Sequence, residues 1–277
     1  MATPRKSPGF LFASLRVFEL SVSEMLWSRR TIFMGLVVGV PVLLALIVRV
    51  LHALGAGGIH VNNTNVNGPA IFGLMIWAFY LRFSVPVLGA FYGTSLIADE
   101  VEDKTITYLF TRPVSRSAVL FGKFLSYVLC TFLVVLPSVT VVWITVTPIG
   151  GALGPSFPDF LKDLLILSAG LVAYGALFAW VGATFKRPLL ASLVFVFGFE
   201  PAVLIFPGYL KRFTLAYYLQ GLVPHAMPND SVVSLVQGIF REIPSLGAAV
   251  TALTLIVAVC LWLAGRTVAN KEYVLEQ

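Results

Sequence analysis

The sequence has 277 residues, of which 58% are hydrophobic and 12% are charged, and its formal net charge is +6. A soluble domain carries about 25% charged residues, so this composition excludes a protein whose whole surface faces water. The length is enough for several membrane-spanning helices of about 20 residues each. We therefore expect one all-α membrane domain over residues 1–277.

The first predicted element is an amphipathic helix over residues 10–28 that lies in the membrane interface as an elbow helix. Its large apolar residues recur at steps of four and three, which is the spacing of one helix face. These residues are Leu11, Leu15, Phe18, Val22 and Met25. A signal peptide is the alternative, but about 30 residues precede the first long apolar run, and that run is too long for a signal peptide.

Two membrane spans follow, over residues of about 31–51 and 70–98. The loop between them is rich in Gly and Asn and is predicted to lie outside the membrane. The second span is interrupted near its middle by Arg82 and Pro86. A charge at this position needs a partner, water or the interior of the bundle.

Residues 99–112 are the main charged interruption of the apolar chain, so they cannot lie in lipid. We expect a short helix here, with Asp99 as its N-cap and Arg112 in its last turn before Pro113. Its semi-apolar face predicts a protein partner. The residues that we assign to this contact are Asp99, Glu100, Val101, Glu102, Asp103, Thr105, Tyr108, Leu109 and Arg112.

This acidic start, the sequence T-I-T-Y-L-F, the following T-R-P-V-S-R and the G-K-F of Gly122–Phe124 together resemble the first cytoplasmic loop of type-two ABC transporter permeases. The resemblance implies that residues 99–112 form a coupling helix that docks on a separate ATP-binding subunit. It also implies an exporter and a second permease copy or a sister permease. The alternative is an ordinary solvated loop whose charges serve only membrane orientation.

Four further spans are predicted over residues of about 117–147, 164–185, 188–206 and 245–265, which makes six in all. Residues 148–158 form a Gly/Pro turn without periodicity. Residues 209–244 are too polar for a span and too apolar for a free loop. They resemble the re-entrant helices of type-two permeases, and a surface loop with two interfacial helices remains the alternative.

The positive-inside rule orients the chain with both termini and residues 99–112 in the cytoplasm. Thirteen basic residues then lie inside: Arg5, Lys6, Arg16, Arg29, Arg30, Lys104, Arg112, Arg116, Lys123, Lys186, Arg187, Arg266 and Lys271. Five lie outside: Arg49, Lys162, Lys211, Arg212 and Arg241. The basic residues are spread over the segment ends and are not gathered in one patch. This distribution favours a role in membrane orientation over nucleic-acid binding. We expect a multi-pass protein of the bacterial plasma or inner membrane.

Arg82 and Glu200 are the two charges predicted inside spans. One interpretation is a static pair that locks the second span to the fifth. The other is that one or both of them line or gate the path of the cargo.

No catalytic or metal-binding pattern is found in the sequence. The three histidines have no metal-ligand spacing, and Gly122-Lys123 lacks the rest of a phosphate-binding loop. We therefore expect no enzyme activity and no cofactor in this chain, with ATP and magnesium on the partner subunit. The alternative to a permease is a membrane scaffold, channel or membrane enzyme that does not pair with an ATPase.

Overall fold

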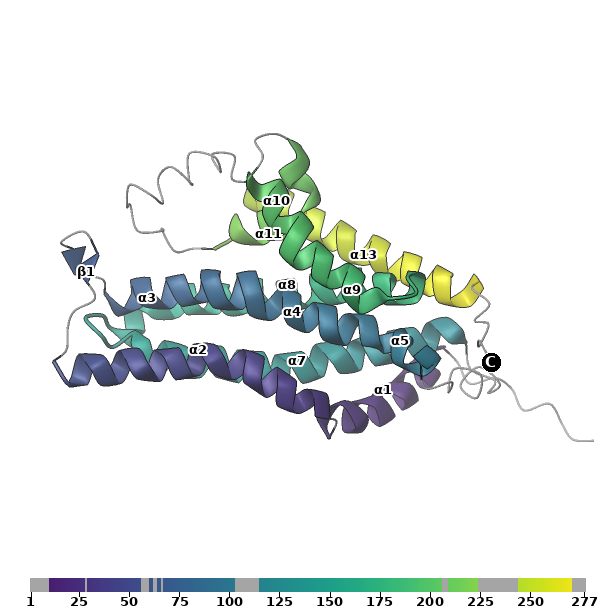
Figure 1. The fold of residues 1–277 in the computed structure, drawn as a ribbon, viewed down its shortest axis with the longest axis horizontal. Coiled ribbons are helices and arrows are strands. Elements are labelled where there is room, and N and C mark those ends of the chain that lie inside the picture. The colour runs from purple at the N-terminus through teal and green to yellow at the C-terminus, as the bar shows by residue number, and fades with distance from the viewer. Residues whose placement is uncertain are drawn as a thin grey trace, which may run out of the picture.

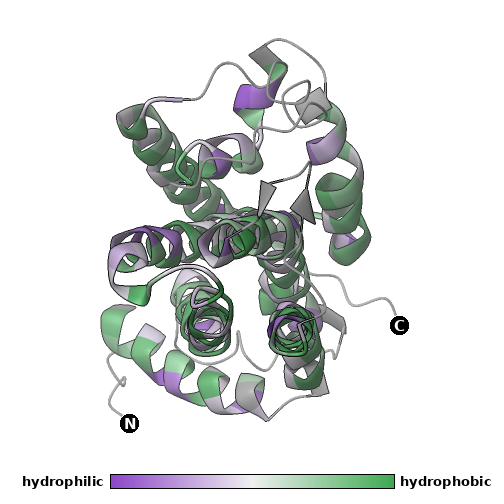
Figure 2. Ribbon diagram, turned by 90° about the vertical axis from the view of Figure 1, so that its left-hand side faces the viewer, coloured by the Kyte–Doolittle hydropathy of each residue, from purple (hydrophilic) through white to green (hydrophobic). Residues whose placement is uncertain are grey.

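The computed structural model of the protein describes residues 10–27, 29–55, 60–61, 64–65, 67–102, 115–205, 209–223 and 244–270. This part of the chain is almost wholly helical, with one antiparallel pair of two-residue strands, β1 (His60–Val61) and β2 (Thr64–Asn65). Figure 2 views the bundle end-on and shows apolar residues along most of its helices. The prediction of an all-α polytopic membrane protein is confirmed.

Among the described residues, five helices are long and apolar enough to cross a membrane. Four of them are α2 (Arg29–Ala53), α7 (Arg116–Val146), α8 (Leu153–Thr184) and α13 (Leu246–Asn270). The fifth is built from consecutive segments: α3 (Gly68–Met75), η1 (Ile76–Ser84), α4 (Val85–Leu88), η2 (Gly89–Gly93) and α5 (Thr94–Glu102). The segments η1 and η2 are π-helical.

The π-helical turn of η1 has a local sequence cause. Pro86 lacks the N–H that would bond to the carbonyl of Arg82, and its ring crowds that carbonyl in a regular α-helix. The wider π turn lies directly before this proline. The predicted interruption of the second span therefore widens the helix without breaking it.

The predicted fifth span is shorter than the others. Its helix consists of α9 (Pro188–Val194), the π-helical η3 (Phe195–Phe199) and α10 (Glu200–Ile205). The apolar part, Pro188–Val203, falls below the length of the other candidate spans. In Figure 1, α9, α10 and α13 run obliquely above α3, α4 and α5, and α2 lies on the far side of these segments. The count of six spans thus stays a prediction, with five long helices and one short apolar helix described.

Helix α8 begins at Leu153, well before the predicted start at residue 164, and it includes Pro158. Pro155 lies in its first turn, where a missing N–H has no helical partner to lose. Aromatic packing holds this extension in place, because the ring of Phe160 stacks on Trp143 of α7 with centroids 4.4 Å apart. Residues 153–158 are therefore helical, and the predicted Gly/Pro turn is confined to the residues before them.

Helix α8 is the centre of the bundle and contacts α5, α7, α9 and α13. Small residues line its contact surfaces and allow close approach of neighbouring helices, as in other membrane proteins. A Cβ atom at Gly182, for example, would collide with the backbone of Thr94 on α5. The largest buried side chains include Tyr127, Tyr174 and Phe178.

The helix ends lie in two groups, one at each end of the bundle (Figure 1). The end of α5, the start of α7 and the end of α13 lie at the same end as α1 (Phe10–Leu26). The strand β1 and the start of α3 lie at the opposite end. This arrangement brings the flanks of the predicted coupling segment close to the predicted elbow helix.

Candidate functional site

The structure describes only the first residues of the predicted coupling segment and its flanks. Residues 103–114, which include Asp103, Thr105, Tyr108, Leu109 and Arg112, lie outside the described residues, and the side chains of Val101 and Glu102 are not described. Asp99 and Glu100 both lie inside α5. The prediction that Asp99 caps the start of a new helix is therefore wrong. No Gly or Pro interrupts the chain here, so the helix of the second span continues past Asp99 to Glu102.

An ion pair joins the start of this segment to α7. The Nζ atom of Lys123 on α7 donates to Oε1 of Glu100 on α5. The two side chains are only 12% and 17% exposed, so water screens the pair less than it screens a surface pair. The exit of α5 and the entry of α7 are thus tied together at the base of the segment.

Helix α1 packs on α7 at the residue next to this ion pair. A Cβ atom at Gly122 would lie 2.5 Å from the Ser14 carbonyl oxygen, so only glycine permits this approach. One turn further along α7, the Ser126 hydroxyl donates to the carbonyl of Phe18 at 3.0 Å. The close contact on α1 is made by small residues, and Ala13 and Ser14 are buried whereas Leu11 and Leu15 are exposed. The G-K-F residues thus contact α1 through Gly122 and α5 through Lys123.

Glu200 is only 4% exposed and lies at the start of α10. The Tyr174 hydroxyl of α8 lies 2.7 Å from each carboxylate oxygen and donates its single hydrogen to this carboxylate. The backbone N–H of Ala216 donates to Oε1 at 2.9 Å. Ala216 is in the first turn of α11 (Leu215–Gln220), so one carboxylate connects three helices.

Arg82 is half-buried on η1, and its guanidinium carbon lies 5.9 Å from the centre of the Trp77 ring. It is close enough to interact electrostatically with Glu200. Among the described residues, however, no ion pair joins Arg82 to Glu200. Whether the two charges act as a static pair or in a cargo path stays a prediction.

Both of the charges that were predicted inside spans lie at π-helical turns. Arg82 is inside η1, and Glu200 directly follows η3. Single π turns are frequent at functional sites, because the extra residue re-aims a side chain and leaves the hydrogen-bond ladder locally loose. The geometry therefore marks this region, in addition to the coupling segment, as a candidate site.

Sequence reasoning missed Tyr174, Trp77 and the backbone of Ala216 as partners of these charges. Tyr174 carried a usable signal, because a tyrosine in the middle of an apolar span needs a hydrogen-bond partner for its hydroxyl. In the part of the chain that the structure describes, no group of three metal-ligating side chains is found. The arrangement around Glu200 offers positioned hydrogen bonds and charges.

A comparison with protein-family models matches residues 23–268 to the ABC-2 family transporter protein. The chain belongs to the ABC-2 transporter family. The match begins in α1 and ends in α13, so it covers nearly the whole helical bundle of this ABC-2 protein. The resemblance that the sequence predicted is thus confirmed. The search of curated proteins found no match.

This membership settles the coarse function. The ABC-2 protein is a multi-pass membrane permease of an ABC transporter. Permeases of this family are normally non-catalytic and work with an ABC ATP-binding subunit, which hydrolyses the ATP.

Proposed function

We propose that the ABC-2 protein is the transmembrane subunit of an exporter driven by a separate ATP-binding subunit. The observation that carries this proposal is the family match over residues 23–268. ATP and magnesium bind on the partner, and two permease chains, either identical or sisters, form the transport path at a two-fold seam. Both termini face the cytoplasm of a bacterial plasma or inner membrane, and residues 209–244 lie near the outer surface.

The docking site for the ATPase in this proposal is the coupling segment, residues 99–112. Its support is the acidic sequence pattern together with its flanks. The part-buried ion pair between Glu100 and Lys123 ties the start of the segment to α7, and α1 packs directly beside it through Gly122. A coupling segment that is anchored in this way can transmit a movement of the ATPase to α5, α7 and α1 together.

Co-purification and mass measurement test the proposal. A tagged chain is expected to retain a nucleotide-binding protein in mild detergent, with two chains of each kind in the complex. ATP turnover should depend on that partner. A single permease chain in the complex would defeat the two-fold arrangement. A chain that never retains an ATPase would favour the scaffold, channel or membrane-enzyme alternative.

Leu109→Asp is expected to separate the permease from its ATPase without unfolding the membrane helices. The substitution places an uncompensated charge in a buried contact, which costs about 3 kcal/mol or more. The measurement is the fraction of ATPase retained in co-purification, with the melting temperature of the permease alone as the folding check. Thr107→Asp is the matched control, because helical periodicity puts residue 107 on the opposite face. Equal retention by both variants and wild type would show that residues 99–112 are only a solvated loop.

A further inference from the structure

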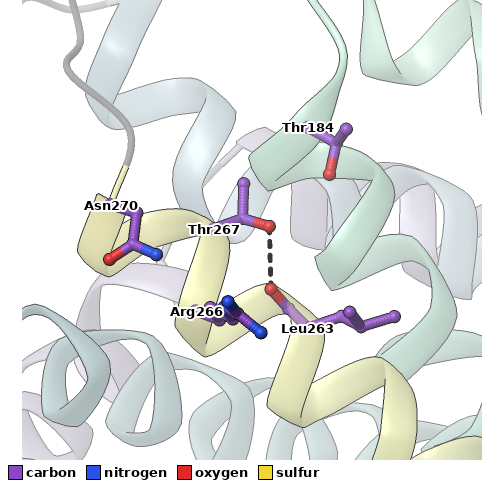
Figure 3. A pocket seen from close by; sticks show the side chains of 5 residues that line it. All are labelled: Thr184, Leu263, Arg266, Thr267 and Asn270. Atoms are coloured by element: carbon purple, nitrogen blue, oxygen red, sulfur yellow. Dashed lines mark hydrogen bonds between the residues drawn. The ribbon is translucent and has the colours of Figure 1, made fainter.

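A hollow of about 410 Å³ lies between the ends of α8 and α13. Figure 3 shows Thr184 on α8 facing the last turns of α13 across this hollow. Its lining residues, among those the structure describes, are Thr184, Leu263, Arg266, Thr267 and Asn270, and none of these five is a carboxylate. Thr184 and Thr267 each donate their hydroxyl hydrogen to a carbonyl of their own helix, at 2.8 Å. Arg266 and Asn270 are therefore the main lining donors available to a ligand.

The hollow lies at the depth where the hydrocarbon of the membrane ends. In α13, residues 246–265 carry no charge, and these twenty residues span about 30 Å, the thickness of the bilayer core. Arg266 is the first charge after this run. On α8, residues 164–185 are likewise uncharged, and the exposed Lys186 and Arg187 follow directly. Both helices thus place their first cations at the level of the lipid phosphates.

Arg266 ends an exposed apolar face of α13. Leu255, Val259 and Trp262 precede it at helical steps of four and three, and all three are exposed. The guanidinium carbon of Arg266 lies 5.4 Å from the centre of the Trp262 ring. No ion pair among the described residues involves Arg266. An apolar track that ends in a cation matches a lipid, with acyl chains along the track and an anionic headgroup at its end.

We propose that this hollow binds the phosphate headgroup of an anionic phospholipid. Arg266 is the phosphate ligand, and the exposed face of Leu255, Val259 and Trp262 contacts the acyl chains. Basic pockets between membrane helices are suited to such headgroups, and tryptophan favours the interface at which they lie. The proposal needs only the membrane location of the chain, so it stands apart from the ATPase partner and the direction of transport.

Native mass spectrometry of the full-length permease tests this site. The detergent-solubilised protein is titrated with phosphatidylglycerol or with phosphatidylcholine of the same acyl chains. Wild type is expected to prefer phosphatidylglycerol, and Arg266→Gln to bind it about fivefold more weakly, the effect of one basic residue at an anionic surface. Arg266→Lys, which keeps the charge, is expected to retain most of the preference. Phosphatidylcholine binding should be equal in all forms.

Arg16→Gln is the matched control. Arg16 is also exposed, and its guanidinium carbon lies 5.1 Å from the centre of the Phe12 ring. It does not line the hollow. Unchanged lipid preference in Arg266→Gln, or an equal loss in both Gln variants, would overturn the proposal in favour of diffuse surface charge. Displacement of phosphatidylglycerol by millimolar inorganic phosphate, seen in wild type and lost in Arg266→Gln, would instead assign the hollow to a free anion and overturn the lipid.

Discussion

Replacing Glu200 with alanine is expected to lower the melting temperature of the solubilised permease by a large margin. The substitution leaves the Tyr174 hydroxyl and the Ala216 N–H without their acceptor in a buried position. An unsatisfied buried group costs about 1–3 kcal/mol, so the two together cost about 2–6 kcal/mol. Glu200→Gln keeps a carbonyl acceptor and should lose less. Tyr174→Phe removes one donor and should lose less still.

The same variants test what the carboxylate does in transport. Limited proteolysis of residues 206–223 should accelerate in Glu200→Ala, because α11 loses the acceptor that holds its first turn. A Glu200→Ala protein with the melting temperature of wild type would exclude a structural role for Glu200. If such a variant also fails to transport, Glu200 acts in the cargo path.

Arg82 provides a separate check on the interpretation of a static pair. Because no ion pair joins it to Glu200, exchanging the two charges is not expected to rebuild the hydrogen bonds to Tyr174 and Ala216. We therefore expect Arg82→Glu combined with Glu200→Arg to express no better than either single variant. Recovery of both expression and transport in the double variant would show a direct structural pair.

Gly122→Ala is expected to detach α1 from α7. The new methyl group would lie 2.5 Å from the Ser14 carbonyl oxygen, and a backbone atom cannot move without moving its helix. Overpacking of this kind costs about 1–3 kcal/mol. The displacement also strains the hydrogen bond from Ser126 to Phe18. A lower melting temperature and faster proteolysis within residues 10–28 are the expected measurements.

Gly39→Ala in α2 is the matched control for this variant. A Cβ atom there meets nothing within 4 Å. Alanine also favours an interior helix position over glycine by about 0.5–1 kcal/mol, so this control should be neutral or slightly stabilising. Equal behaviour of the two variants would mean that α1 is held by contacts other than its approach to Gly122. A loss of ATPase retention in Gly122→Ala alone would link α1 to the proposed coupling.

Much of the fold could be predicted from the sequence because lipid imposes a simple rule. Long uncharged runs must be helices, since every backbone polar group in hydrocarbon has to bond within its own segment. The runs that became α2, α7 and α13 were recognised for this reason. The charged residues 99–112 were recognised because they cannot share that environment, and the order of their motifs led to the family.

Residue partners could not be predicted in the same way. In a soluble helix the apolar face marks the core, but a membrane helix is apolar both where it packs and where it meets lipid. Periodicity therefore showed the apolar face of α1 with Leu11 and Leu15, which the structure leaves exposed, but it did not show that Ala13 and Ser14 make the close contact with α7. The same ambiguity hid the early start of α8, whose aromatic residues pack on α7.

The sequence by itself determined that this chain is a helical membrane permease and where its charged segment lies. Only the tertiary structure decided that Gly122 receives α1, that Lys123 pairs with Glu100, and that Glu200 binds Tyr174 and the start of α11. The physical reason is that the two kinds of feature depend on different lengths of the chain. Transfer into lipid depends on each segment's own composition, whereas a buried hydrogen bond or a close helix contact depends on atoms that distant parts of the chain bring together.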